Sequence, residues 1–189
     1  GFAATPPDGR RATVGAFARK SKVQVAINGD FFNLDTRVPI CYAMGGGVHW
    51  EGTPDTKRCG QVAAGGGRVE IVPPAAEFAA EPWVREVVSG HPLVLRDGAV
   101  VEDGDGLVTA RHPRSAVGLS KDGRRLILLV VDGRQKHSVG MTGKELGRAL
   151  AELGAWNGLN LDGGGSSALY IEGRGVVNSP SDGQERLDA

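Results

Sequence analysis

The sequence lacks most features that would point to a membrane or to nucleic acid. Its 189 residues contain no apolar run of about 18 residues, the length that crosses a bilayer. Lysine plus arginine and aspartate plus glutamate balance at 22 each, so no overall positive charge attracts nucleic acid or an anionic membrane. We therefore expect no nucleic-acid partner and no membrane insertion, and any anionic ligand requires a local site.

Cysteine is also scarce, because the chain has only Cys41 and Cys59, in one region predicted to be a loop. Two thiols without a neighbouring histidine make a poor zinc site. They either remain reduced and buried or form a disulfide, which would stabilise the fold by about 3 kcal/mol on the chain-entropy model. We favour the disulfide, which indicates a secreted or cell-envelope protein. No signal peptide is visible, and the abrupt start at Gly1 indicates a trimmed or processed N-terminus.

Glycine, in contrast, is in surplus, with 30 residues, about twice the usual share of roughly 7%. In one stretch Asp162 is followed by Gly163–Gly165 and then by Ser166 and Ser167. Each glycine costs roughly 0.5–1 kcal/mol against alanine in a regular element, so the run indicates positive φ angles or a close backbone approach. It forms either a nest of N–H groups for an anion or a tight turn. Its spacing fits neither a P-loop nor a dinucleotide-binding fingerprint.

Local patterns predict two helices and several strands. Thr13 is the expected N-cap of a short helix, and Thr142–Glu145 has the spacing of a capping box before an apolar helical face. Asp97-Gly98 is one of several hairpin signals. The most hydrophobic run, Leu126–Val131, is expected to be the central strand of the sheet.

The stretch from Asn33 to Gly67 reads instead as a long loop with two glycine triplets. Long loops in compact domains often act as lids or binding walls. We therefore predict an α+β fold in which residues 1–189 form a single domain. It has a mixed, mainly antiparallel β-sheet covered by about two helices, and its long Gly-rich loops form the site.

Five motifs follow one another along nearly the whole chain. They are Asn28-Gly29-Asp30-Phe31-Phe32, Arg114-Ser115-Ala116-Val117-Gly118, Asp132-Gly133-Arg134, Asn160-Leu161-Asp162-Gly163-Gly164-Gly165-Ser166-Ser167 and Asn178-Ser179-Pro180-Ser181-Asp182. Together they resemble the phosphodiester glycosidase family, and the fourth motif is the most specific. The resemblance implies hydrolysis of a sugar-1-phosphodiester of the N-acetylglucosamine type at the glycosidic carbon, which releases a free sugar and a phosphomonoester. It implies a carbohydrate phosphodiester as partner and no required cofactor.

The chemistry of that bond indicates which residue types are needed. Breaking a sugar C1–O bond builds oxocarbenium character, which a carboxylate stabilises as nucleophile, base or counter-charge. A phosphate leaves as an anion, so arginine and backbone N–H groups that hold its charge matter more than a strong acid. We therefore expect Arg114 to hold phosphate and Asp162 or Asp30 to face the sugar, with Glu185 as a third candidate carboxylate. The candidate substrate- or phosphate-binding residues are Asn28, Arg114, Asp132, Arg134, Gly163, Gly164, Gly165, Ser166, Ser167, Ser181 and Asp182.

Two other functions stay open at the level of sequence. Asp30, Asp132 and Asp162 all lie near predicted strand ends, and converging carboxylates suit Mg²⁺ or Ca²⁺ in a metal-dependent phosphodiesterase that cleaves the P–O bond. The chain is alternatively a non-catalytic module that binds phosphorylated cell-envelope glycans. Arg114 alone is equally compatible with a surface salt bridge, and Asp132 with a turn cap. The set of motifs favours the glycosidase.

Overall fold

The computed structural model describes residues 1–7, 12–51, 57–75, 78–102 and 109–187. Two helices and mainly antiparallel strands form in these residues, which confirms the predicted α+β class. The elements are α1 (Val14–Ser21), β1 (Val25–Ile27), β2 (Met44–Gly45), β3 (Val48–His49), β4 (Gly60–Gly65), β5 (Arg68–Val72), β6 (Glu86–Gly90), β7 (Leu93–Arg96), β8 (Ala99–Val100), β9 (Arg114–Leu119), β10 (Leu126–Val131), α3 (Gly143–Glu152), β11 (Asn157–Asn160), the 3₁₀ helix η2 (Gly164–Ser166), β12 (Leu169–Ile171) and β13 (Gly175–Val176).

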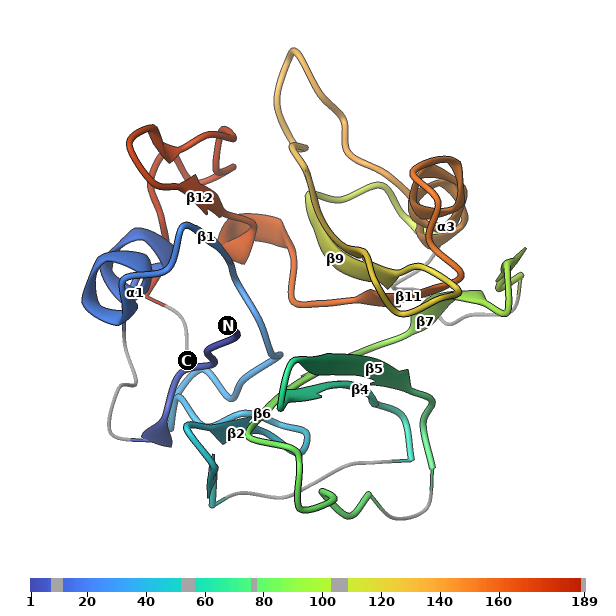
Figure 1. The fold of residues 1–189 in the computed structure, drawn as a ribbon. Coiled ribbons are helices and arrows are strands. Elements are labelled where there is room, and N and C mark those ends of the chain that lie inside the picture. The colour runs from blue at the N-terminus through green and yellow to red at the C-terminus, as the bar shows by residue number, and fades with distance from the viewer. Residues whose placement is uncertain (8–11, 52–56, 76–77, 103–108, 188–189) are drawn as a thin grey trace.

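The described strands form three sheets rather than one. The small sheet has the order β1-β12-β13, the central sheet β10-β9-β11-β7-β8 and the outer sheet β3-β2-β6-β4-β5. Each pair within them is antiparallel. In Figure 1 the small sheet and α1 lie on one side, the central sheet with α3 on the other, and the outer sheet below them.

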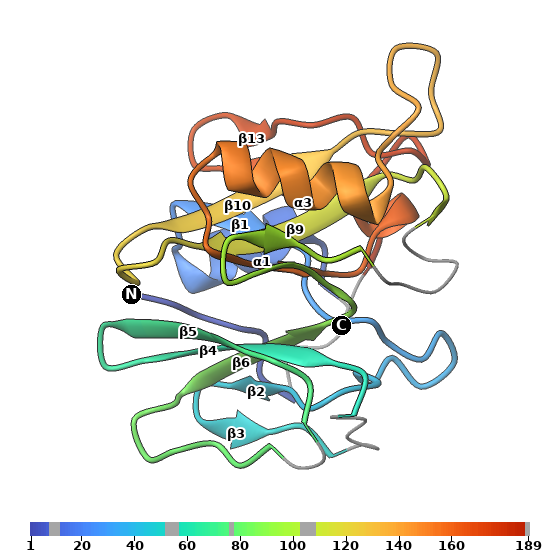
Figure 2. The same cartoon turned by 90° about the vertical axis from the view of Figure 1, so that its right-hand side faces the viewer.

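The central sheet has apolar contacts on both faces. Helix α3 covers one face with Leu146 and Leu150, which are fully buried against Val94 and Leu95. The predicted capping box is present, because the Thr142 side chain and the Glu145 side chain each bond the other residue's backbone N–H. The opposite face packs its own buried residues, Leu159 among them, against the outer sheet. Figure 2 shows the resulting layers, with α3 above the central sheet and the outer sheet below it.

Two predictions about strands were wrong. The stretch 33–67 contains β2, β3 and β4, of which β2 and β3 have two residues each, too few to produce a period-2 pattern. Strand β10 pairs with β9 alone and is therefore an edge strand of the central sheet. Its six residues are only half-buried, although the run is strongly hydrophobic. Hydrophobicity identified the strand, but its neighbours are set by chain topology.

Helix α1 packs on the small sheet and follows the predicted Thr13 cap. The Thr13 hydroxyl accepts the N–H of Ala16 at 3.1 Å, and Lys22 ends the helix in the left-handed region with φ 54°. Its first turn contains no acidic residue. The helix buries Val14 and Ala18 against the small sheet. Among the described residues, no helix has the length and apolarity to cross a membrane.

Candidate active site

One buried amide fixes the end of β1 to two neighbouring segments. The Asn28 amide donates to the Asp162 carbonyl at 2.7 Å, and its oxygen accepts from the Ser115 hydroxyl at 2.6 Å and the Ala168 N–H at 3.2 Å. Only 3% of Asn28 is exposed. Asn28 therefore lies beneath the candidate site and holds its walls together, and its predicted contact with substrate stays a prediction.

Two carboxyl groups meet above this amide. The backbone joins their segments, because the Asp162 N–H donates to the Gly29 carbonyl at 3.0 Å. Asp30 accepts the Ser89 N–H at 2.7 Å. Asp162 accepts the Gly163 N–H at 2.8 Å and a hydrogen bond from the Ser166 side chain. Both carboxyl groups are half-buried and held by donors that fix their orientation.

The surroundings give these two carboxyl groups different protonation behaviour. Burial raises the pKa of Asp30 to about 7, and the charge of Asp162 adds to this effect, while N–H donors from Ser89 and Asp30 itself oppose it. Burial also raises the pKa of Asp162, but Ser166, the Gly163 N–H and the charge of Arg186 counteract it. Two neighbouring carboxyl groups with different environments are a common arrangement for acid and base roles.

Each glycine of the triplet meets a close neighbour. A Cβ on Gly163 would lie 2.8 Å from the Pro113 carbonyl oxygen, and Gly164 has φ +62° beside the Arg134 guanidinium. A Cβ on Gly165 would lie 2.5 Å from both Arg186 Nε and Asp182 Oδ2. The run therefore serves a positive φ at Gly164 and a close approach at its neighbours, the two reasons expected for consecutive glycines.

The alternative interpretation, an open nest of N–H groups, does not fit this loop. The Gly163 N–H donates to the Asp162 carboxylate, and the Gly164 N–H donates to the Pro113 carbonyl at 3.0 Å. The N–H groups of Ser166 and Ser167 donate to carbonyls of the same loop. Ser166 and Ser167 are themselves only 3% and 1% exposed, and their contact with phosphate stays a prediction.

Gly165→Ala should damage the site more than the fold. The added methyl group displaces the flexible ends of the Arg186 and Asp182 side chains, so we expect a lower kcat/KM with little loss of stability. Thermal unfolding and steady-state kinetics measure both. Gly123→Ala is the control, because Gly123 has open space around it in the distant β9–β10 turn and its φ of +69° makes alanine costly only for the fold. Wild-type kcat/KM in Gly165→Ala would contradict the close contact.

Two arginines and a histidine lie beside the glycine loop. We call this group, Arg114, Arg134 and His112, the cationic wall. Arg134 is exposed, and its Nη2 lies 3.2 Å from Nδ1 of His112. Because arginine only donates, His112 Nδ1 accepts this bond and the ring proton resides on Nε2. Burial and the charges of both arginines lower the pKa of His112, which keeps the ring neutral.

Arg114, predicted to hold phosphate, is the buried base of this wall. Only 3% of it is exposed, its Nε donates to the Met141 carbonyl at 3.0 Å and its Nη2 to the Ala110 carbonyl at 2.9 Å. Burial and the neighbouring Arg134 lower the pKa of Arg114. Arg134 is therefore the arginine whose guanidinium is presented at the surface of the wall. Direct binding of phosphate by Arg114 stays a prediction.

The remaining predicted site residues lie along the C-terminal segment. Asp132 Oδ1 accepts from the Asn178 amide and the Ser179 N–H, both at 3.0 Å. The Ser181 hydroxyl donates to Asp182, which also forms a salt bridge with Arg186. Glu185 accepts the Gly15 N–H of α1 at 2.7 Å.

The three aspartates do not converge as a metal site would require. The Asp132 carboxylate is bound to the C-terminal segment, away from the contact that joins the other two segments. Within the part of the chain that the structure describes, no three His, Cys, Asp or Glu side chains gather closely enough to hold a metal ion. The described residues therefore give no support to the alternative in which Asp30, Asp132 and Asp162 share one metal ion.

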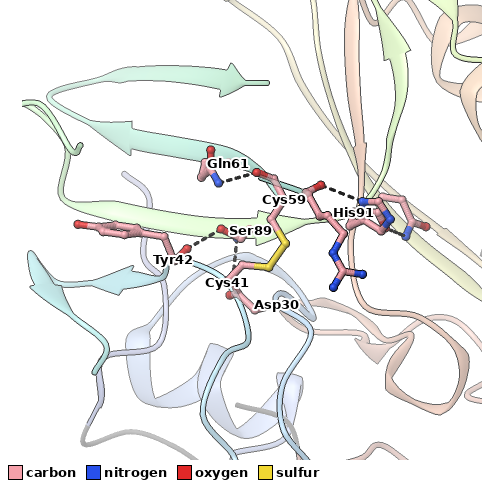
Figure 3. The surroundings of a disulfide bond; sticks show 9 residues. Asp30, Cys41, Tyr42, Cys59, Gln61, Ser89 and His91 are labelled. Atoms are coloured by element: carbon pink, nitrogen blue, oxygen red, sulfur yellow. Dashed lines mark hydrogen bonds between the residues drawn. A yellow bond between two sulfur atoms is a disulfide. The ribbon is translucent and has the colours of Figure 1, made fainter. Parts of the chain in front are cut away.

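The predicted disulfide between Cys41 and Cys59 is confirmed and lies behind Asp30. Figure 3 shows it beside Ser89, whose N–H donates to Asp30 and whose hydroxyl donates to the carbonyl of Tyr42. The disulfide thus fixes the segment next to Cys41, and Ser89 joins that segment to Asp30. It supports one wall of the candidate site as well as the fold.

Sequence reasoning missed His112 and Arg186. The position of His112 directly before Pro113 and the Arg114 motif was the available signal, but a single histidine at a strand start is most often structural. Arg186 was seen only as part of a polar C-terminus. Tertiary folding places both residues at the site. Neither lies in a local sequence motif that indicates a function.

Known proteins are similar to this chain in sequence and in fold. A family model described as phosphodiester glycosidase matches residues 21–189. The SPbeta prophage-derived uncharacterized protein YomE of Bacillus subtilis is 40% identical over 79 residues, covering 42% of this chain and 12% of that protein. Bovine N-acetylglucosamine-1-phosphodiester alpha-N-acetylglucosaminidase is 30% identical over 195 residues, covering 92% of this chain and 36% of that protein. The chain thus spans much less than half the length of these two relatives.

Two solved structures have the same fold. The catalytic domain of zebrafish N-acetylglucosamine-1-phosphodiester alpha-N-acetylglucosaminidase, auto-inhibited by its pro-peptide, superposes with a TM-score of 0.74 at 24% identity, over 95% of this chain and 64% of that one. A putative exported protein from Burkholderia pseudomallei gives a TM-score of 0.73 at 17% identity, over 98% of this chain and 68% of that one.

Proposed function

Because this chain belongs to the phosphodiester glycosidase family, we propose that residues 1–189 form a catalytic domain that hydrolyses the glycosidic C–O bond of a sugar-1-phosphodiester. Water supplies the hydroxyl that ends on C1, and the C1–O bond breaks to release a phosphomonoester. The observation that supports this most is the pairing of two unlike carboxyl groups, Asp30 and Asp162, beside the glycine loop and the cationic wall.

Asp162 is the carboxylate best suited to the developing charge at C1. The Ser166 hydroxyl, the Gly163 N–H and the charge of Arg186 all favour its anionic form. An anion at this place stabilises an oxocarbenium-like transition state, as the nucleophile in a retaining reaction or the base in an inverting one. Asp30, whose pKa of about 7 keeps much of it protonated at neutral pH, serves as the proton donor and acceptor.

The cationic wall is the proposed site for the phosphate. The exposed guanidinium of Arg134 offers paired N–H donors, and the neutral His112 ring adds its Nε2–H. Negative charge on the departing phosphate grows as C1–O breaks, so these donors bind the transition state better than the ground state. Arg114 supports the wall from beneath through its two carbonyl contacts.

We propose a sugar of the N-acetylglucosamine type and a site of action outside the cytoplasm. The sugar follows the printed activity of the bovine relative. The compartment follows from the disulfide between Cys41 and Cys59, because such bonds persist in oxidising environments.

Hydrolysis of an alkyl N-acetylglucosamine-1-phosphate in ¹⁸O-labelled water tests the proposal. We expect mass spectrometry to find the label in the sugar, which reports C–O cleavage. Label in the phosphate would overturn the proposal in favour of attack at phosphorus, and micromolar binding without turnover would favour a glycan-binding module. The same reaction without protein corrects for spontaneous hydrolysis.

A further inference from the structure

The C-terminal segment 177–187, here called the C-terminal strap, crosses the edge of the candidate site. One end is tied to the loop after β10, because Asp132 accepts the Ser179 N–H at 3.0 Å and the Gln135 amide donates to the Ser179 carbonyl at 2.6 Å. Asn178 joins this end to β12 by accepting the Leu169 N–H at 2.8 Å. The strap is therefore fixed at its start by hydrogen bonds to two separate elements.

The far end of the strap is fixed on α1 by Glu185. Its carboxylate accepts the Gly15 N–H at 2.7 Å, next to the Thr13 cap that accepts the Ala16 N–H. The first turn of α1 has no acidic residue of its own. A negative charge is favourable at a helix N-terminus, where N–H groups lack partners within the helix. Glu185 supplies this missing charge from a segment 170 residues away in the sequence.

Between these two ends the strap holds an ion pair against the glycine loop. Arg186 Nε donates to Asp182 Oδ2 at 2.6 Å, across one turn of the strap. Both groups lie so near Gly165 that a Cβ there would be 2.5 Å from each. Burial raises the pKa of Asp162, and the charge of Arg186 opposes this effect across the same loop. The strap thus brings a cation from the end of the chain to the reacting carboxylate.

We propose that Glu185 is a positioning residue rather than a catalytic carboxylate, and that it anchors the strap on α1 so that Arg186 stays over Gly165 beside Asp162. The proposal rests on the proposed function only in treating Asp162 as the reacting carboxylate. The Glu185 carboxylate accepts the Gly15 N–H of α1, whereas the donors that orient Asp30 and Asp162 are the N–H groups of Ser89 and Gly163.

The titration of the Asp162 carboxyl carbon tests this anchoring independently of turnover. ¹³C NMR of wild type is compared with Arg186→Gln and Glu185→Ala, and the Asp162 signal is assigned by its absence in Asp162→Asn. We expect the pKa of Asp162 to rise in Arg186→Gln, to rise in the same direction in Glu185→Ala, and to rise no further in the double variant. Glu172→Gln, which removes an exposed acid from the nearby small sheet, should leave it unchanged.

The conservative variants separate anchoring from folding. Arg186→Lys keeps the positive charge and should restore most of the wild-type titration. Glu185→Gln keeps an oxygen that accepts the Gly15 N–H, so it should shift Asp162 less than Glu185→Ala does. Where turnover is measured, the acid limb of kcat/KM should move to higher pH with each shift.

Two results would overturn the proposal. One is an Asp162 titration in Glu185→Ala that matches wild type. The other is a loss of kcat in Glu185→Gln by one constant factor at every pH, which is the behaviour of a catalytic carboxylate. If no sugar phosphodiester is hydrolysed, the proposed function fails, whereas the NMR titration still decides how the strap acts.

Discussion

Replacing Asp162 by asparagine should lower kcat about 10²–10⁴-fold, the range that a positioned acid–base group contributes. The variant keeps the shape of the side chain and an oxygen that accepts the Gly163 N–H. It loses the negative charge that we propose faces C1, so the oxocarbenium-like transition state loses its counter-charge while ground-state binding is nearly unchanged. We therefore expect the loss in kcat, with a KM close to wild type.

Asp122→Asn is the matched control for this substitution. Asp122 makes the same kind of local contacts, with the Ser120 hydroxyl and the Arg124 N–H, but it lies in the exposed turn after β9. Its kcat should equal that of wild type. Steady-state kinetics on a sugar-1-phosphodiester measures both variants, and an Asp162→Asn enzyme within threefold of wild type would remove Asp162 from the chemistry.

Replacing Asp30 by asparagine should stabilise the protein at neutral pH while slowing the reaction. An unfolded aspartate ionises near its ordinary pKa of 3.8, but the folded Asp30 does so only near 7. Between pH 3.8 and about 7, Asp30 holds a proton in the folded protein that it has lost in the unfolded protein. The free energy of unfolding of wild type therefore falls as pH rises through this range. Asparagine has no such cost and still accepts the Ser89 N–H. Above pH 7 the variant should gain roughly 2–4 kcal/mol.

The two readouts of Asp30→Asn are separable. Urea unfolding from pH 4 to pH 8 should give curves that diverge with rising pH, with the variant the more stable. In kinetics, wild-type kcat/KM should fall as Asp30 loses its proton near pH 7, and this limb should vanish in the variant along with most of the rate. Parallel stability curves would show that Asp30 ionises normally in the folded protein.

Local sequence patterns correctly predicted the helix caps and the hairpin, because these features depend on residues close together in the sequence. The capping box at Thr142, the Thr13 cap and the Asp97-Gly98 hairpin each involve residues a few positions apart, and all three are found. The edge position of β10 was not predictable in this way. It depends on which strands lie beside β9, and hydrophobicity does not encode that choice.

The site shows the same division. Asp30 and Asp162 stood out because each follows a predicted strand, Asp30 directly after Asn28-Gly29 and Asp162 directly before three glycines. The burial of Arg114, the exposure of Arg134 and the contact of Glu185 with α1 depend on packing between distant segments. Residue type therefore singled out the two carboxylates as candidates, but it could not tell the buried Arg114 from the exposed Arg134.

The pairing of β1 with β12 affects when the candidate site can fold during synthesis of the chain. Val25 pairs with Ile171, and Arg186 follows later still, so the candidate site needs segments that are far apart in the sequence. Contacts this distant in sequence close late and slow the folding of β-rich domains. A nascent chain that has passed Asp30 still lacks Asp162 and Arg186. The candidate site therefore forms only once residues up to Arg186 have been synthesised.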